Sequence, residues 1–209
     1  QGRIWIASEA QNLFCYDLKE QSLRNYILTE HSLVSTNVKC LTVDNSGTIW
    51  IGFYGDGLFY SKDNLKTLHP YLSPVDNEET YNDDVVSKIV LGAYNCLYIS
   101  SLKGGVKELN LTSGKLRDLL LKDENNEAIY CRTLLVYTDN ELWIGTESGV
   151  YIYNLRTEKY THLRSSEYDP YSLSDNAIYS FCKDREDGIW IGSYLSLIHI
   201  SEPTRRTPI

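Results

Sequence analysis

Residues 44–60 read DNSGTIWIGFYGDGLFY, and the four residues Ile49-Trp50-Ile51-Gly52 at their centre decide the fold. An aliphatic residue, an aromatic residue, an isoleucine and a small residue follow one another here, with polar turn residues on both sides. Short apolar runs bounded by Gly, Asp, Asn and Ser are typical of β-strands and the turns that join them. The stretch therefore predicts a β-hairpin.

The same pattern recurs along the whole chain. Its aromatic residue stands at Trp5, Trp50, Tyr98, Trp143 and Trp190. The intervals are 45, 48, 45 and 47 residues, and all four tryptophans of the chain occupy this one position. A fixed period of this length is the signature of a repeat architecture.

Each unit contains four short β-rich runs separated by turn residues, and no segment keeps a helical apolar period over a long stretch. Four strands in about 45 residues indicate one blade of a β-propeller. The sequence thus predicts an all-β fold of about four four-stranded blades, with part of a fifth begun. Because both ends fall inside a unit, we expect a slice of a larger propeller, with seven blades in the parent.

The repeated aromatic residues are predicted to form the core between blades, since one sheet cannot bury both of its faces alone. Burial of one such ring contributes roughly 1.5–3 kcal/mol. The small residue two places later is expected to leave room for the ring, and it is a glycine at Gly52, Gly145 and Gly192. Ser172-Leu173 echoes Ser32-Leu33 at the same place in another unit, so we interpret this loop as structural, with Leu173 closing the core.

The repeat covers residues 1–194 and then stops abruptly. Residues 195–209, LSLIHISEPTRRTPI, resemble the translated adapter sequence found at the ends of many environmental assemblies. We therefore interpret residues 195–209 as a non-native tail. A genuine, divergent blade end is the alternative.

Three stretches resemble the two-component regulator propeller repeat: Asp44 to Tyr60, Thr138 to Asn154 and Asp169 to Ser193. The unit around Tyr98 diverges, with Tyr for Trp and Ser for Gly. In that family, paired propellers form the periplasmic part of hybrid sensor histidine kinases of Bacteroidetes type. The resemblance implies a non-catalytic sensing domain that binds an oligosaccharide, joins further blades of its parent chain and signals across a dimer.

Composition excludes several other classes of protein. The formal net charge of -8 argues against nucleic-acid binding, which needs a basic face for the phosphates. No apolar run is long enough for a transmembrane helix. We expect no cofactor and no metal site, because the histidines share no repeat position and the five cysteines form no C-x-x-C motif. Cys40, Cys131 and Cys182 lie in apolar runs and are predicted to be buried.

Residues that occur in only one unit are better ligand-binding candidates than repeated ones, because repetition indicates scaffold. Two longer loops carry such residues: His69, Tyr71, Tyr81, Asp83, Arg164, Glu167 and Tyr168. Tyrosine beside an acid or amide suits sugars, since the ring stacks on C–H faces while polar groups bind hydroxyls. Ordinary exposed loop residues are the alternative for each. For the chain as a whole, the alternatives are a stand-alone lectin-like propeller and a propeller polysaccharide lyase or hydrolase.

Overall fold

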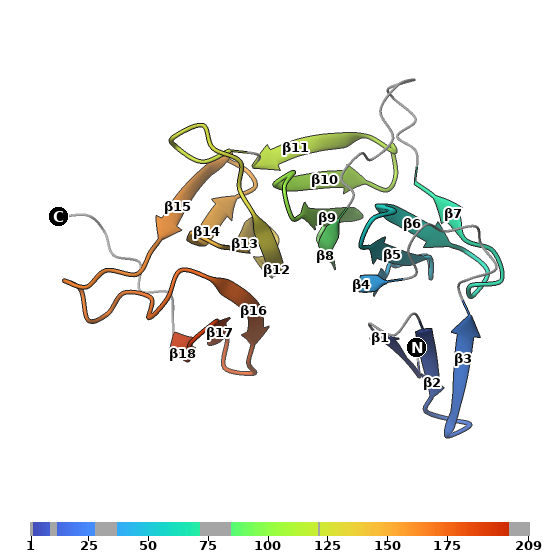
Figure 1. Ribbon diagram of the computed structural model, residues 1–209. Coiled ribbons are helices and arrows are strands. Elements are labelled where there is room, and N and C mark those ends of the chain that lie inside the picture. Colours follow the sequence, from blue (N-terminus) through green and yellow to red (C-terminus); the bar gives the residue numbers. More distant parts are fainter. Residues whose placement is uncertain (1, 9–11, 28–36, 72–84, 121, 201–209) are drawn as a thin grey trace.

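A computed structural model describes residues 2–8, 12–27, 37–71, 85–120 and 122–200. These residues form five antiparallel sheets that follow one another along an arc (Figure 1). Every hydrogen-bonded neighbour within a sheet is also the neighbour in sequence, so each sheet is a simple meander. This confirms the prediction of an all-β propeller arrangement.

Three sheets have four strands each, with the first strand of each on the inner side of the arc (Figure 1). The second sheet contains β4 (Val38–Val43), β5 (Ile49–Phe53), β6 (Leu58–Ser61) and β7 (His69–Pro70). The third contains β8 (Val86–Leu91), β9 (Cys96–Ser101), β10 (Val106–Asn110) and β11 (Leu116–Leu120). The fourth contains β12 (Cys131–Thr138), β13 (Glu141–Thr146), β14 (Gly149–Asn154) and β15 (Lys159–Leu163).

The two outer sheets have three described strands each. The first sheet contains β1 (Arg3–Ser8), β2 (Asn12–Asp17) and β3 (Ser22–Ile27). The fifth contains β16 (Ile178–Lys183), β17 (Ile189–Ser193) and β18 (Leu197–Ile200). Compared with the middle sheets, the described part of the first sheet has no innermost strand and that of the fifth has no outermost strand. Among the described residues, three sheets therefore have four strands and two have three, and the blade number of the parent stays a prediction.

The alternation of side chains along the motif strand explains how neighbouring sheets pack. In β5, Ile49 and Ile51 point toward the first sheet and join a buried cluster with Leu13. Trp50, between them, points the other way and packs with Val86 and Leu97 of the third sheet. Because successive residues of a strand face opposite sides, one I-W-I motif supplies core to two interfaces.

The repeated aromatic residues are buried only where another sheet follows. Trp50, Tyr98 and Trp143 are 6%, 4% and 1% exposed, whereas Trp5 is half-buried. Trp190 is 37% exposed in this chain, so its place in an inter-blade core stays a prediction. Its face of the fifth sheet has no described sheet packed against it. Cys182, the cross-strand partner of Trp190, is exposed for the same reason, while Cys40 and Cys131 are buried.

The glycine of the motif serves a different purpose from the one predicted. A Cβ atom at Gly52 would lie 2.6 Å from Cys40 Sγ and 2.8 Å from Val86 Cβ of the next sheet. At Gly145 it would lie 2.6 Å from Thr133 Cγ2 and 2.8 Å from Ile178 Cγ2. The missing side chain thus makes room for the innermost strands of its own and the next sheet, not for the motif aromatic ring.

The start of the predicted tail takes part in the fifth sheet. Strand β18 pairs with β17, and Ile198 packs against the buried cluster that contains Trp143. Leu173 belongs to the same cluster and is 6% exposed, in agreement with its predicted core role. Residues 201–209 lie outside the described residues.

Candidate functional site

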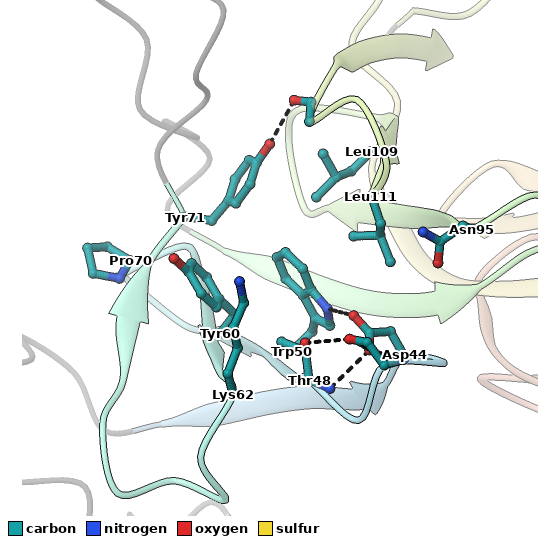
Figure 2. Close-up of a pocket in the computed structure, with 12 residues that line it drawn as sticks. Asp44, Thr48, Trp50, Tyr60, Lys62, Pro70, Tyr71, Asn95, Leu109 and Leu111 are labelled. Atoms are coloured by element: carbon teal, nitrogen blue, oxygen red, sulfur yellow. Dashed lines mark hydrogen bonds between the residues drawn. The ribbon is translucent and has the colours of Figure 1, made fainter.

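A pocket of about 480 Å³ opens between the second and third sheets (Figure 2). We call it the interblade pocket. Residues from the second sheet and from turns of the third line it: Asp44, Ser46, Thr48, Trp50, Tyr60, Lys62, Pro70, Tyr71, Asn95, Leu109, Leu111 and Gly114. A concave surface with aromatic walls and a few polar groups is the usual form of a small-molecule site.

Three aromatic rings form one wall of the interblade pocket. The ring centroid of Trp50 lies 5.4 Å from that of Tyr60 and 5.7 Å from that of Tyr71. Tyr60 is the cross-strand partner of Trp50 on β6, which places both side chains on the same face of the sheet. His69, opposite Tyr60 on β7, extends the row with a centroid distance of 5.5 Å.

Tyr71 also ties the two sheets together at this pocket. Its hydroxyl donates a hydrogen bond of 3.1 Å to the carbonyl oxygen of Gly114 in the turn between β10 and β11 (Figure 2). Burial, and to a smaller degree the neighbouring Tyr60, raises the pKa of the Tyr71 hydroxyl. The hydroxyl therefore stays protonated and can donate at neutral pH.

Asp44 lines the pocket, but its carboxylate accepts hydrogen bonds from the turn between β4 and β5 and from Trp50. Oδ1 accepts hydrogen bonds from the Ser46 and Thr48 backbone at 2.9 and 3.0 Å, and Oδ2 accepts one of 2.9 Å from Trp50 Nε1. Asp184 accepts equivalent hydrogen bonds from Gly188 and from Trp190 Nε1 in the fifth sheet. The recurrence identifies this carboxylate as scaffold that orients the motif tryptophan.

We expect Asp44→Asn to cost about 1–3 kcal/mol at pH 7, because one acceptor oxygen replaces two and a buried donor loses its partner. Burial alone would raise the pKa of Asp44, but the hydrogen bonds from Ser46, Trp50 and Thr48 outweigh it and hold the pKa below its usual range. A lowered folded pKa gives stability that is present above the unfolded pKa of about 3.9 and is lost as the pH falls through the folded pKa.

Urea unfolding of both proteins at pH 7 and at pH 3 tests this expectation. The difference between wild type and Asp44→Asn should shrink at the lower pH. The matched variant Asp184→Asn should cost less, because the indole that Asp184 orients is 37% exposed. A difference that does not change with pH would show that the Asp44 charge contributes nothing to stability.

Two further polar side chains give the pocket hydrogen-bonding capacity. Lys62 Nζ lies 5.6 Å from the ring centroid of Tyr60, so one face of this ring meets a cation. Asn95, on the third sheet, donates a 3.1 Å hydrogen bond from Nδ2 to Thr112 Oγ1. The pocket therefore combines neighbouring, mutually tilted aromatic rings with an ammonium group and an amide.

The structure separates the sequence-predicted ligand residues into two groups. Tyr71 lines the interblade pocket and His69 stands beside it, whereas Tyr81 and Asp83 lie outside the described residues. The second group follows β15 in the fourth sheet, at the other side of the arc from β7 (Figure 1). Its members are Arg164, Glu167 and Tyr168.

The second group lies on an exposed part of the described surface. Tyr168 is 96% exposed, and Glu167 is exposed as well. Arg164 donates a 2.9 Å hydrogen bond to Glu124 Oε1 and one of 3.0 Å to Nδ1 of His162. It therefore ties the loop before β12 to strand β15. Burial, and to a smaller degree Arg164, lowers the pKa of His162, so this imidazole is neutral at pH 7.

Sequence reasoning missed Tyr60, Lys62 and Asn95. The sequence did contain an indication for Tyr60. Tyr60 stands opposite the motif aromatic residue on the next strand, and the residue type at this opposite position changes from sheet to sheet. The partner is Cys15, Tyr60, Glu108 or Ile152. A variable residue at a repeated position is where a repeat protein can place chemistry without disturbing its scaffold.

Within the described ranges, no group of three or more His, Cys, Asp or Glu side chains is placed to hold a metal ion. Likewise, the described chain contains no helix with the length and apolarity needed to cross a membrane.

Solved structures share this fold. The chain aligns with the extracellular domain of BT4673 from B. thetaiotaomicron at TM-score 0.78 and 18% identity. BT4673 is described in one structure as a hybrid two-component system and in another as a one-component system. The chain also aligns with the corresponding domain of BT3049 from the same organism at TM-score 0.56 and 22% identity. A streptogramin B lyase structure aligns at TM-score 0.67 and 16% identity.

These alignments cover 95%, 93% and 98% of this chain. The chain spans only 26% of the BT4673 domain, 31% of the BT3049 domain and 66% of the lyase. At such identities the likeness shows the fold alone. Comparison with curated proteins found no match.

A family profile identifies the repeat itself. The profile of the two component regulator propeller matches residues 32–55 and 172–195. Each match includes the innermost strand and the motif strand of one sheet, β4 with β5 and β16 with β17. Two segments of this β-propeller thus match the two component regulator propeller repeat.

Proposed function

We propose that this chain belongs to the extracytoplasmic sensor domain of a two-component signalling protein and binds an oligosaccharide in the interblade pocket. The observation that carries the proposal is the row of Trp50, Tyr60 and Tyr71 rings beside the Lys62 ammonium and the Asn95 amide. Sugar rings stack their C–H faces on aromatic rings, while their hydroxyls take hydrogen bonds from polar side chains.

The repeat family and the extracellular domains that share the fold support the sensor role and an extracytoplasmic, periplasmic location. The lyase that shares the fold shows that a propeller can equally carry catalysis, so the fold alone does not decide between sensor and enzyme. In our proposal the chain itself is non-catalytic. Further blades, seven in all, complete the ring, and ligand binding is passed on across a dimer to a kinase.

Binding to the immobilised 209-residue chain tests the proposal. The probes are hexasaccharides of the cello-, xylo-, malto- and arabino- series, measured by biolayer interferometry. We expect at least one series to bind, and we expect Tyr60→Ala to weaken it about tenfold through loss of a stacking surface worth ~1.4 kcal/mol.

Lys62→Gln is a second pocket variant that should fold like the wild type, because Lys62 is exposed and its substitution leaves no cavity in the core. It should weaken binding several-fold. Tyr160→Ala is the matched control, since this tyrosine lies on the outer strand of the fourth sheet and is 38% exposed. Absence of binding by all four series, or equal binding by the wild type and both pocket variants, would contradict the proposal.

A further inference from the structure

The four innermost strands carry the same irregularity at the same place. Strands β4, β8, β12 and β16 lie along the inner side of the arc (Figure 1). In each of them, the pairing with the motif strand shifts in register between the first and the third residue of the strand. The residue inside the shift is Lys39, Ser87, Arg132 or Tyr179. A bulge of this kind re-aims one side chain away from the regular alternation.

A second residue is fixed beside each bulge by a repeated backbone hydrogen bond. The donor of this bond is the backbone N–H of the residue fifteen positions after the bulge residue. The acceptor is the carbonyl oxygen of the residue two positions before the bulge residue. The four bonds measure 3.0, 3.1, 3.2 and 3.0 Å, and they are Tyr54 to Asn37, Leu102 to Val85, Glu147 to Tyr130 and Tyr194 to Ala177. The backbone frame is therefore the same in all four sheets.

The side chains on this constant frame are different in every sheet. The pairs of bulge residue and partner are Lys39 with Tyr54, Ser87 with Leu102, Arg132 with Glu147, and Tyr179 with Tyr194. Scaffold positions in this chain repeat their residue type, as the motif aromatic does. Variable chemistry on a repeated frame is what a recognition surface requires.

In the fourth and fifth sheets, the two pairs join into one array. Arg132 Nε donates a 2.6 Å hydrogen bond to Glu147 Oε1 in its own sheet. The Arg132 guanidinium also lies over the Tyr179 ring of the next sheet, 4.3 Å from its centroid. Tyr179 and Tyr194 follow with centroids 6.0 Å apart. In the third sheet, by contrast, Ser87 Oγ donates 2.8 Å to the carbonyl oxygen of Cys131 and so serves as a tie between sheets.

The members of this array are open to solvent. Tyr194 is 72% exposed and Tyr179 is 45% exposed, and the side chains of Arg132 and Glu147 are 30% and 42% exposed. The array stands at the end of the sheets where β13 turns into β14. The interblade pocket is lined by turns at the opposite end, such as those that hold Asp44 and Gly114. The two sites are therefore distinct.

We infer that Arg132, Glu147, Tyr179 and Tyr194 form a second saccharide-binding site, specific for a neutral sugar ring with two adjacent hydroxyls. The guanidinium donates to one hydroxyl oxygen while the carboxylate accepts from the neighbouring hydroxyl. The tyrosine rings supply an amphipathic stacking surface. The inference rests on the proposed function in so far as both assign a saccharide ligand, but it concerns different residues at the other end of the sheets.

The test uses the immobilised 209-residue chain with the same four hexasaccharide series. Arg132→Gln and Tyr194→Ala should each weaken binding of at least one series about tenfold, as expected for loss of a charged hydrogen bond or a stacking ring. Lys39→Gln is the matched control, because Lys39 occupies the same bulge in the second sheet, where its Nζ lies 5.6 Å from the ring centroid of Tyr54 and outside the array, and it should bind as the wild type does. The side chains of Arg132 and Tyr194 are partly and largely exposed, so the far-UV circular dichroism of both variants should match that of the wild type.

The outcomes separate the two sites. Loss of binding in the Arg132 and Tyr194 variants, with wild-type behaviour of the Lys62 variant, supports this array and overturns the interblade pocket. The reverse pattern overturns the array and leaves the proposed function standing. Independent loss of two binding phases, one in each set of variants, supports both sites. Absence of saccharide binding by the wild-type chain overturns both.

Discussion

Trp143→Ala is expected to destabilise the chain by about 3–5 kcal/mol, the usual cost of removing a fully buried tryptophan. Trp143 is 1% exposed and packs between the fourth and fifth sheets with Val150, Ile178 and Ile191. Its Nε1 also donates a 2.7 Å hydrogen bond to Glu141. The substitution would leave a cavity at the interface of the fourth and fifth sheets and would also remove the hydrogen bond to Glu141.

Urea unfolding followed by far-UV circular dichroism measures this effect. Trp190→Ala is the matched control, because Trp190 occupies the same repeat position on the fifth sheet but is 37% exposed. We expect a loss of about 1 kcal/mol or less there. If Trp143→Ala lost under about 1 kcal/mol, the motif aromatic residues would not be the main source of cohesion between sheets.

The chain is expected to self-associate at micromolar concentration, because the outward face of the first sheet is apolar. Ile4, Ile6 and Leu23 are 48%, 44% and 58% exposed. The equivalents of Ile4 and Ile6 in the second sheet, Ile49 and Ile51, are 2% and 0% exposed because the first sheet covers them. Contiguous exposed apolar surface of this kind drives association.

Analytical ultracentrifugation of the wild type and of the double variant Ile4→Thr/Ile6→Thr tests this prediction. The double variant should shift the distribution toward monomer, since it removes apolar surface without touching the buried core. The same pair of changes at Ile49 and Ile51 should instead unfold the second sheet. A wild-type chain that sediments as a monomer and melts in a single sharp two-state transition would contradict the prediction.

Much of the fold follows from the sequence because its determinants are local. The period of the motif fixes the number of motif strands, and the alternation of Ile and Trp within each strand fixes which residues face opposite sides. The turn residues between short apolar runs fix the meander. For these reasons the strands around Trp50, Tyr98 and Trp143, and the core position of Leu173, could be predicted without coordinates.

The candidate sites were harder to predict from the sequence, because they depend on contacts between residues that are far apart in the chain. The interblade pocket depends on the distance between two sheets, so Tyr60 and Asn95 meet only once the third sheet is packed on the second. The array of Arg132, Glu147, Tyr179 and Tyr194 depends on bulges, which reverse the side-chain alternation that a reader of the sequence assumes. Arg164, predicted as a ligand residue, is instead bonded to Glu124 and His162.

The sequence by itself thus determined the repeat, the all-β class and the alternation of large apolar residues along the motif strands. Tertiary structure alone decided which faces of the sheets are covered by a neighbouring sheet, and which strands approach the glycines of the motif. Trp190 and Trp143 have the same local pattern, yet Trp190 is 37% exposed and Trp143 is 1% exposed, because the fifth sheet packs on Trp143 and no described sheet packs on Trp190. Gly52 and Gly145 are glycines because a neighbouring sheet approaches them, and that approach is a property of packing rather than of the strand.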